Sequence, residues 1–390
     1  MRILFSAGFF PSENHPFTSF IGDMAKAMVK NGHEVTVLAP QSITKNLIRG
    51  GDLLPIHEKV SVETENGGRK SITVYRPKVF TLGDRWKILG KVTFFLRKWG
   101  CNRVLNKHKG NFDVVYSHFW ECGYNVSDYV RSEILPMIVV SGEDEIVLNK
   151  YLTAKQLNRL ESITKRVICV SGKNRDESIE CGLCKAADCE VIPNGADMSK
   201  FHPMSRDLAR KQIGLDNNSF IISFVGRFIE RKGAMRIIKA LEKLSDSDIK
   251  GIFIGKSFGD PTQEPTGEYV AFKGVVPHDK IPVYLNASDV YVLPTLAEGC
   301  SNSIVEAMAC GLPIISSDMP FNYDILDSSN SILISPRDVV GIALAIKGLK
   351  DAPQLRASMG MESFVKAQEL SFDKRVHKIL CIIEQVVEDN

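Results

Sequence analysis

Residues 290–315 read VYVLPTLAEGCSNSIVEAMACGLPII, and this stretch decides the fold. The apolar run 290–293 is typical of a short buried strand, and the apolar spacing that follows predicts a helix over about 302–310. Gly311 is placed to end that helix, and the apolar run 313–315 predicts another strand. Strand, helix and strand in this order form a βαβ unit, and such units impose parallel sheets.

The same alternation of short apolar runs and helical patterns extends along the whole chain. Further strands are expected at 3–5, 35–38, 113–116, 137–140, 166–170, 190–192, 220–225 and 251–254. Because single cores stop growing near ~250–300 residues, a chain of 390 residues is expected to form two domains. We therefore predict an α/β protein of two Rossmann-like, doubly wound parallel-sheet domains, with a ligand site in the cleft between them.

The domain boundary is expected where the composition changes. Residues 193–218 are rich in Pro, Gly, Asn and Asp, which is typical of linkers. We expect an N-terminal Rossmann-like domain at 1–195, a linker at 196–218 and a C-terminal Rossmann-like domain at 219–370. A last helix at 371–390 could pack back on the N-terminal domain.

The composition is that of an ordinary globular protein, with 44% apolar and 24% charged residues, which argues against disordered and fibrous classes. A formal charge of +3 is too small to indicate a nucleic-acid partner. The first residues, broken by Gly8 and Pro11, are typical of a strand and not of a signal peptide. The nine cysteines are scattered through apolar segments, as reduced thiols are. We expect a cytoplasmic protein.

The first candidate site is the turn between the strand at 290–293 and the helix that follows. Glu298 lies in this turn and Glu306 lies on the helix, while Ser301 or Asn302 is a natural N-cap. A helix N-terminus presents unpaired amides and the positive end of its dipole, which favour a bound phosphate. We therefore assign the turn residues to an anionic ligand: Gly299, Cys300, Ser301 and Asn302. Two solvated glutamates on a surface helix are the alternative.

The second candidate site follows the strand at 220–225, where the sequence reads FVGRFIERKGAMRIIKAL from Phe224. Arg227 and Lys232 flank the start of the next helix, and cations at that position favour an anion such as a diphosphate. Arg231 and Arg236 are interpreted as surface charge.

These motifs resemble those of the retaining glycosyltransferases of family four, which have the GT-B fold. The family signature E-x7-E corresponds to Glu298 and Glu306, and the Gly-Arg and Lys-Gly pairs that contain Arg227 and Lys232 match as well. The resemblance implies that Arg227 and Lys232 neutralise the diphosphate of a UDP- or GDP-sugar donor. It also implies that Glu306 hydrogen-bonds the donor ribose and that Glu298 lies near the donor sugar. The sequence has Cys300 where the family usually has phenylalanine, so the sugar stays open.

The N-terminal half resembles the family less closely. The segment 191–201 matches the family segment near the hinge, and His118 follows a predicted strand. A histidine there could hydrogen-bond the donor sugar or the acceptor, and a buried structural histidine is the alternative. Two segments depart from the family pattern, namely His15-Pro16 in place of a Gly-Gly turn and Ser141 in place of a histidine.

Several competing motifs fail on spacing. The first strand lacks the G-x-G-x-x-G of dinucleotide-binding sites, and residues 251–257 are one residue short of a P-loop. The D-x-D at 246–248 follows a helix, at the wrong end of the expected sheet. Cys181, Cys184 and Cys189 lack a fourth ligand for zinc. We therefore expect no metal site, and no cofactor besides the nucleotide-sugar donor.

Residues 85–109 contain eight basic residues and no acid, interleaved with Trp86, Phe94, Phe95 and Trp99. A basic helix with aromatic residues can lie on an anionic membrane surface. The alternative is a helix whose aromatic residues are core and whose cations are merely solvated. If this helix contacts the inner face of the membrane, a lipid-linked acceptor is the expected substrate.

The resemblance thus implies a retaining, metal-independent hexosyltransferase of polysaccharide biosynthesis, in which Glu298, His118, Arg227 and Lys232 are the catalytic candidates. The acceptor would be a glycan or a lipid-linked glycan. Two alternatives remain open: a non-catalytic nucleotide-sugar-binding subunit of a glycosylation complex, and a sugar-nucleotide epimerase or hydrolase.

Overall fold

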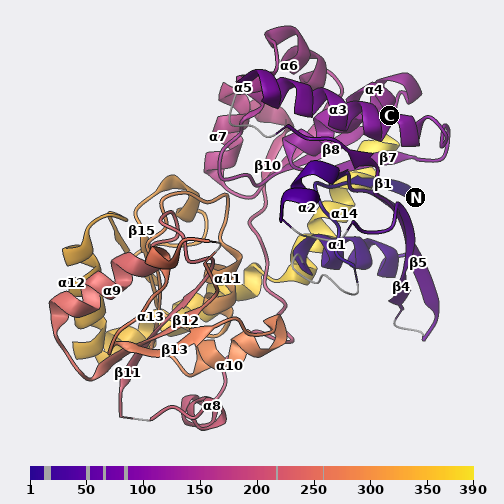
Figure 1. The fold of residues 1–390 in the computed structure, drawn as a ribbon. Coiled ribbons are helices and arrows are strands. Elements are labelled where there is room, and N and C mark those ends of the chain that lie inside the picture. Colours follow the sequence, from indigo (N-terminus) through magenta and orange to yellow (C-terminus); the bar gives the residue numbers. More distant parts are fainter. Residues whose placement is uncertain (13–18, 50–52, 65–66, 83–86, 217, 258) are drawn as a thin grey trace. The chain divides into compact units, whose positions relative to one another are not determined.

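The computed structural model describes the whole chain except residues 13–18, 50–52, 65–66, 83–86, 217 and 258. It contains two compact units, each built on a largely parallel β-sheet (Figure 1). Unit 1 comprises residues 1–170, 174–192 and 376–390, and unit 2 comprises residues 171–173 and 193–375. The expected α/β architecture with Rossmann-like domains is confirmed.

The sheet of unit 1 has the strand order β10-β9-β8-β7-β1-β2-β5-β4. Strand β4 pairs antiparallel with β5, and the other neighbouring pairs are parallel. A separate parallel pair joins β3 (Gln41–Ser42) and β6 (Lys78–Val79). The strands of the main sheet are β1 (Arg2–Ser6), β2 (Glu34–Leu38), β4 (His57–Glu63), β5 (Arg69–Tyr75), β7 (Val114–His118), β8 (Met137–Ser141), β9 (Thr164–Cys169) and β10 (Cys189–Val191).

Helices lie between these strands and supply the rest of the core of unit 1. Val115, Val139 and Val167 from the neighbouring strands β7, β8 and β9 meet Trp120 and Tyr129 of α4 in one buried cluster. The helices are α1 (Ser19–Lys30), α2 (Ile43–Arg49), α3 (Lys87–Leu105), α4 (Trp120–Glu133), α5 (Leu148–Tyr151), α6 (Ala154–Glu161), α7 (Gly172–Glu180), the 3₁₀ helix η1 (Ala186–Asp188) and α14 (Phe372–Glu388), whose residues from 376 onward belong to unit 1.

The sheet of unit 2 is entirely parallel, with the order β13-β12-β11-β14-β15-β16. Its strands are β11 (Phe220–Val225), β12 (Ile249–Ile254), β13 (Val270–Gly274), β14 (Val290–Leu293), β15 (Ile314–Ser317) and β16 (Ser331–Ile334). Counted within the unit, this is the order 3-2-1-4-5-6 of nucleotide-binding sheets, in which ligands bind where the strand order reverses. That point lies at the carboxyl ends of β11 and β14.

Helices of unit 2 connect these strands. They are α8 (Arg206–Ile213), α9 (Ala234–Leu244), α10 (Ile281–Asn286), α11 (Asn302–Ala309), α12 (Val339–Asp351) and α13 (Pro353–Glu369), with the 3₁₀ helices η2 (Pro261–Gln263), η3 (His278–Lys280) and η4 (Pro320–Asn322). The helix predicted over about 302–310 is present as α11. Each strand expected from an apolar run is present as well, whereas β4, β5, β13, β16 and the two-residue strands β3 and β6 were not expected.

The segment predicted to be a linker, 196–218, is instead part of unit 2. Phe201 is fully buried, and the guanidinium of Arg210 on α8 is buried as well. Arg210 donates to Oδ2 of Asp289 at 2.7 Å, and Arg206 donates to Oδ1 of the same carboxylate at 2.5 Å. Pro, Gly, Asn and Asp mark turns in this segment, but the ion pairs to Asp289, the residue before β14, fix it to the unit.

Candidate active site

The loop after β11 is held against the end of β14 at a glycine. Gly233 has a φ of +86°, and a Cβ there would lie 2.8 Å from the carbonyl oxygen of Pro294. Both the conformation and the space therefore require glycine. This close approach brings Lys232, the residue before it, to the turn that carries Glu298.

Lys232 and Glu298 form the central ion pair of this site. The Lys232 ammonium lies 2.6 Å from Oε1 of Glu298, and both side chains are largely buried. The same oxygen accepts from the hydroxyl of Thr295 at 2.9 Å and from Nη1 of Arg231 at 3.2 Å. No described residue donates to Oε2 of Glu298. One oxygen of the carboxylate thus binds the protein, and the other is available to a ligand hydroxyl.

The interpretation of Arg231 and Arg236 as surface charge is wrong. Arg231 contacts Glu298 and donates to the carbonyl oxygen of Ala297, so it belongs to the site. Arg236 is buried and donates to the carbonyl oxygens of Glu230 and Pro294, both at 2.8 Å. The guanidinium of Arg236 can be buried because these carbonyls, together with the Glu230 carboxylate at 2.7 Å, satisfy two of its nitrogens.

Arg227 lies at the same strand end but is exposed to solvent. Its side chain forms no ion pair or hydrogen bond with the described residues. A long, mobile cation in this position can reach a phosphate without first breaking a contact with the protein.

Glu306 lies on α11 and is paired with a histidine that the sequence did not indicate. Nε2 of His278, on η3, lies 2.8 Å from Oε1 of Glu306. The His278 ring lies 5.3 Å from the Phe201 ring, which helps to position it. Oε2 of Glu306 receives no donor from the described residues. Glu306 therefore repeats the arrangement of Glu298, with one oxygen bound and the other available.

The turn Gly299–Asn302 contributes backbone groups to the site. No described residue accepts a hydrogen bond from the amides of residues 299–303. Ser301 is the N-cap of α11, but its side chain makes no capping bond. The side chain of Cys300 is buried, which raises the pKa of its thiol to about 11, and its carbonyl accepts from Asn194 at 3.0 Å. This turn can offer amides to an anion, but it offers no thiolate.

His118 ends β7 in unit 1, so it belongs to a different unit from the residues above. Its ring is buried and lies 5.8 Å from the Phe20 ring and 4.2 Å from the Phe119 ring. Phe119 has a φ of +80°, a conformation that is rare outside glycine and costs of order 1–3 kcal/mol. The strain marks this strand end, which is the reversal point of the sheet of unit 1.

The helix that follows His118 already has a carboxylate at its N-terminus. The amide of Trp120 donates to Oε1 of Glu143 at 2.7 Å, and the amide of Gly142 and the hydroxyl of Ser141 donate to Oε2. Burial raises the pKa of Glu143, against the opposing effect of these hydrogen bonds. Ser141, which departs from the family pattern, thus helps to hold a carboxylate of the chain itself. His15-Pro16 lies outside the described residues.

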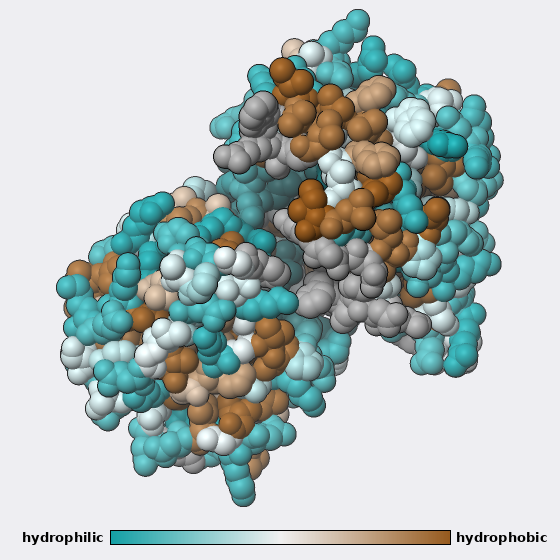
Figure 2. Space-filling view, viewed as in Figure 1, coloured by the Kyte–Doolittle hydropathy of each residue, from teal (hydrophilic) through white to brown (hydrophobic). Residues whose placement is uncertain are grey.

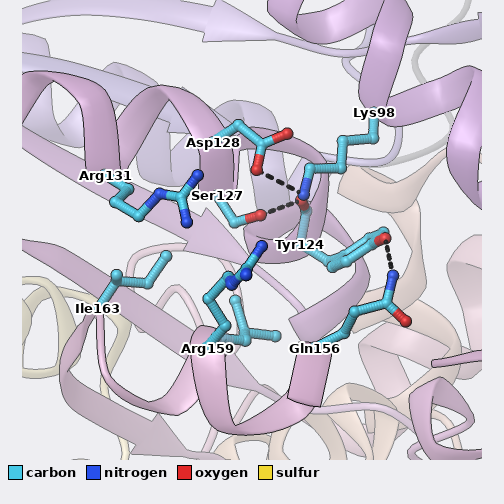
Figure 3. Close-up of a pocket in the computed structure, with 9 residues that line it drawn as sticks. Lys98, Tyr124, Ser127, Asp128, Arg131, Gln156, Arg159 and Ile163 are labelled. Carbon is cyan, nitrogen blue, oxygen red and sulfur yellow. Dashed lines mark hydrogen bonds and ion pairs between the residues drawn. The ribbon is translucent and has the colours of Figure 1, made fainter. Parts of the chain in front are cut away.

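A polar hollow in unit 1 lies between α3, α4 and α6 (Figure 3). Lys98 is paired with Asp128 at 2.8 Å on one side, and Gln156 donates to the Tyr124 hydroxyl at 3.1 Å. None of the predicted site residues lines it.

The described residues contain no cluster of three or more His, Cys, Asp or Glu that could hold a metal ion, and none of the described helices is long and apolar enough to cross a bilayer. Asp246 of the D-x-D segment pairs with Lys350 at 2.6 Å.

Comparison with known proteins identifies the family. Residues 18–200 match the model "Glycosyltransferase Family 4", and residues 205–364 match the model "Glycosyl transferases group 1". A Bacillus subtilis protein described as a teichuronic acid biosynthesis glycosyltransferase, TuaC, is 27% identical over 89% of this chain and 88% of its own length. The UDP-Gal:alpha-D-GlcNAc-diphosphoundecaprenol alpha-1,3-galactosyltransferase of Escherichia coli is 28% identical over 64% of this chain and 68% of its own.

Solved structures show the same fold. The Anabaena protein Alr3699/HepE in complex with UDP has a TM-score of 0.72 at 18% identity, over 98% of this chain and 99% of its own. The sucrose-phosphate synthase of Thermosynechococcus elongatus has a TM-score of 0.75 at 18% identity, over 100% and 99% of the two chains. Because the two family models follow one another along nearly the whole chain, each on one sheet, the chain belongs to the glycosyltransferases of the family-four type, with the GT-B fold.

Proposed function

We propose that this glycosyltransferase moves a hexosyl unit from a nucleotide diphosphate sugar to a glycan or a lipid-linked glycan, with retention of the anomeric configuration. UDP-sugars are the first donors to test, because the E. coli relative is a UDP-Gal-dependent transferase and the similar Anabaena structure is a complex with UDP. The acceptor of the E. coli relative is linked to diphosphoundecaprenol, which supports a lipid-linked acceptor here.

The observation that carries the proposal is the anion site at the ends of β11 and β14. The amides of residues 299–303 donate to none of the described residues, and Lys232 and Arg231 lie beside the same turn. Amides at a helix N-terminus together with cations form a site for a diphosphate. Arg227 would add a third cation from its exposed position.

Glu298 and Glu306 would hold the two ends of the donor. Each carboxylate has one oxygen engaged by protein donors and one oxygen to which no described residue donates a hydrogen bond. We assign Oε2 of Glu306 to a hydroxyl of the ribose and Oε2 of Glu298 to a hydroxyl of the transferred sugar. His278 would fix the carboxylate of Glu306 in the orientation that this contact needs.

The transfer itself would proceed on one face of the sugar. The bond from the anomeric carbon to the diphosphate oxygen breaks, and the acceptor oxygen bonds to that carbon on the same face. The acceptor proton passes to the departing phosphate oxygen, so that charge and atoms balance. Lys232 and the amides of the turn stabilise the negative charge on the leaving diphosphate.

A double displacement through Glu298 is disfavoured by its contacts. Lys232, Arg231 and Thr295 all donate to one oxygen of this carboxylate, and such donors reduce its nucleophilicity. His118 in unit 1 is proposed to contact the acceptor or the donor sugar through its ring.

The proposal is tested by incubating the full chain with a panel of UDP- and GDP-hexoses and a polyprenyl-diphosphate-linked GlcNAc acceptor. We expect nucleotide release that requires the acceptor and a product whose anomeric proton coupling matches the donor. An inverted product would overturn retention. Release without acceptor would favour the hydrolase or epimerase alternative, and donor binding without turnover would favour the binding-subunit alternative.

A further inference from the structure

One face of α3 in unit 1 exposes a stripe of large apolar side chains. Ile88, Val92, Phe95 and Trp99 are 75%, 38%, 64% and 53% exposed. Their spacing of four, three and four residues places them on one side of the helix. The helix is anchored through its opposite side, where Phe94 and Cys101 are buried in the core. The aromatic residues of this segment therefore divide between core and surface.

Neighbouring segments add apolar residues to this stripe. Phe80 and Leu82 are exposed, and the amide of Leu82 donates to Oγ1 of Thr93 on α3 at 2.9 Å. Thr81 between them is hydrogen-bonded to Thr44 of α2, where Leu47 and Ile48 are exposed. Figure 2 shows hydrophobic side chains gathered on the face of unit 1 that carries α3 and α2. We call these eight residues the apolar face: Leu47, Ile48, Phe80, Leu82, Ile88, Val92, Phe95 and Trp99.

The charges beside the apolar face are positive. Helix α3 contains no acidic residue, and Lys87 and Lys91 are exposed on the same side of the helix as the stripe, with no ion pair to the described residues. The guanidinium of Arg103 lies 5.6 Å from the Trp99 ring. Lys98, by contrast, pairs with Asp128 and is part of the packing between α3 and α4.

The polar hollow between α3, α4 and α6 adds two more exposed cations to unit 1. Arg131 on α4 and Arg159 on α6 line it and are exposed, and neither forms an ion pair with the described residues (Figure 3). In Figure 3 both guanidinium groups point into the same space. The apolar face and its neighbouring cations complement a surface whose outer layer is negatively charged and whose inner layer is apolar.

We propose that unit 1 docks on the surface of a bilayer that contains anionic phospholipid. The stripe of α3 enters the boundary between headgroups and acyl chains, while Lys87, Lys91 and Arg103 contact headgroup phosphates. This surface lies in unit 1 and uses none of the residues assigned to the donor. Docking would hold the enzyme where a lipid-linked acceptor is presented.

The test is co-sedimentation of the full chain with vesicles, in the absence of any donor. We expect binding to phosphatidylcholine vesicles that contain 30% phosphatidylglycerol, and little binding to pure phosphatidylcholine. The double variant Phe95→Gln/Trp99→Gln should lose most of this binding. The double variant Lys87→Glu/Lys91→Glu should bind at least about 20-fold more weakly, because each cation near the surface contributes roughly fivefold.

The matched control is Leu344→Gln, which replaces an equally exposed apolar residue of α12 in unit 2 and should bind as the wild type does. Circular dichroism of each variant confirms that it is folded.

Equal binding to both kinds of vesicle, or variants that bind normally, would overturn the proposal. So would a wild-type dimer without lipid that Phe95→Gln/Trp99→Gln converts to a monomer, since the stripe would then pair two copies of the chain. Donor binding, measured separately, is expected to be unchanged, so failure here leaves the proposed function standing.

Discussion

Helices α4 and α11 occupy equivalent positions in the two units, since each follows a strand at the reversal point of its sheet. At α4, the amide of Trp120 already donates to the Glu143 carboxylate. At α11, the amides of residues 299–303 donate to none of the described residues, and Lys232 lies nearby at the Glu298 carboxylate. This difference between the two helix N-termini indicates which of them can bind a diphosphate. An incoming anion would have to displace a carboxylate of the chain in unit 1, whereas unit 2 offers donors and cations together.

The largest effect is expected from removing the cation at α11. Lys232→Met should lower the rate of donor-dependent transfer by about 10²–10³-fold, because the leaving diphosphate loses a preorganised charge. The measurement is initial-rate kinetics with a saturating acceptor. Arg227→Met is the comparison, and its effect should be smaller because the Arg227 side chain is exposed and not held in position. Equal losses in both variants would mean that position and burial do not matter.

The second effect is on stability, and it measures what the ion pair between Lys232 and Glu298 contributes to folding independently of catalysis. Lys232→Met leaves the buried Glu298 with only Arg231 and Thr295, and should lower the free energy of unfolding by about 1.5–3 kcal/mol. Adding Glu298→Gln removes the buried charge that has lost its nearest cation and should recover part of that loss. Urea unfolding of the wild type, both single variants and the double variant measures the coupling. Strict additivity would show that the pair is not energetically coupled.

The third effect concerns the other carboxylate of unit 2. Glu306→Gln should raise the KM for the donor about tenfold, because a neutral amide accepts a weaker hydrogen bond from a ribose hydroxyl. His278→Ala should raise it by a smaller factor, since the carboxylate remains but loses its orienting partner at 2.8 Å. Donor-saturation kinetics distinguish the two variants. An unchanged KM in Glu306→Gln would remove Glu306 from the donor site.

The smallest effect is expected at the corresponding position of unit 1. Glu143→Ala removes the acceptor at the start of α4 and should lower the free energy of unfolding by about 1 kcal/mol. The KM for the donor should not change. A large rise in that KM would mean that the diphosphate reaches α4 after all.

Glu143 also predicts a pH dependence, because burial raises its pKa in the folded state. Between the ordinary pKa of a glutamate and this raised pKa, the folded chain holds a proton that the unfolded chain has lost. The contribution of Glu143 to stability therefore falls as the pH rises through this window. Glu143→Gln should flatten that part of the profile, measured by urea unfolding at several pH values. A profile identical to that of the wild type would contradict the shift.

Much of the fold could be predicted because buried parallel strands are continuous apolar runs, as in β11 and β14. The edge strand β4 was missed because its residues are mostly exposed or partly exposed and polar. Helix α8 was assigned to a linker because its flanks are rich in turn residues, and its attachment depends on Arg210 meeting Asp289, which lies 79 residues away.

The parts of the candidate site that lie in short sequence motifs could be predicted from the sequence. Glu298, Glu306 and Lys232 lie in short motifs directly after predicted strands, and the structure brings Lys232 to Glu298. His278 was missed because it is a single histidine on a short 3₁₀ helix, and only the fold brings it to Glu306. Arg236 was misassigned because a buried arginine can be recognised only from the carbonyls that surround it.

The comparison of the two helix N-termini is tested most directly by amide hydrogen exchange of the full chain, with and without saturating UDP. We predict that UDP slows exchange in peptides that cover residues 299–305 and leaves peptides that cover residues 119–123 unchanged. Protection at residues 119–123 without protection at 299–305 would contradict the assignment of the diphosphate to α11.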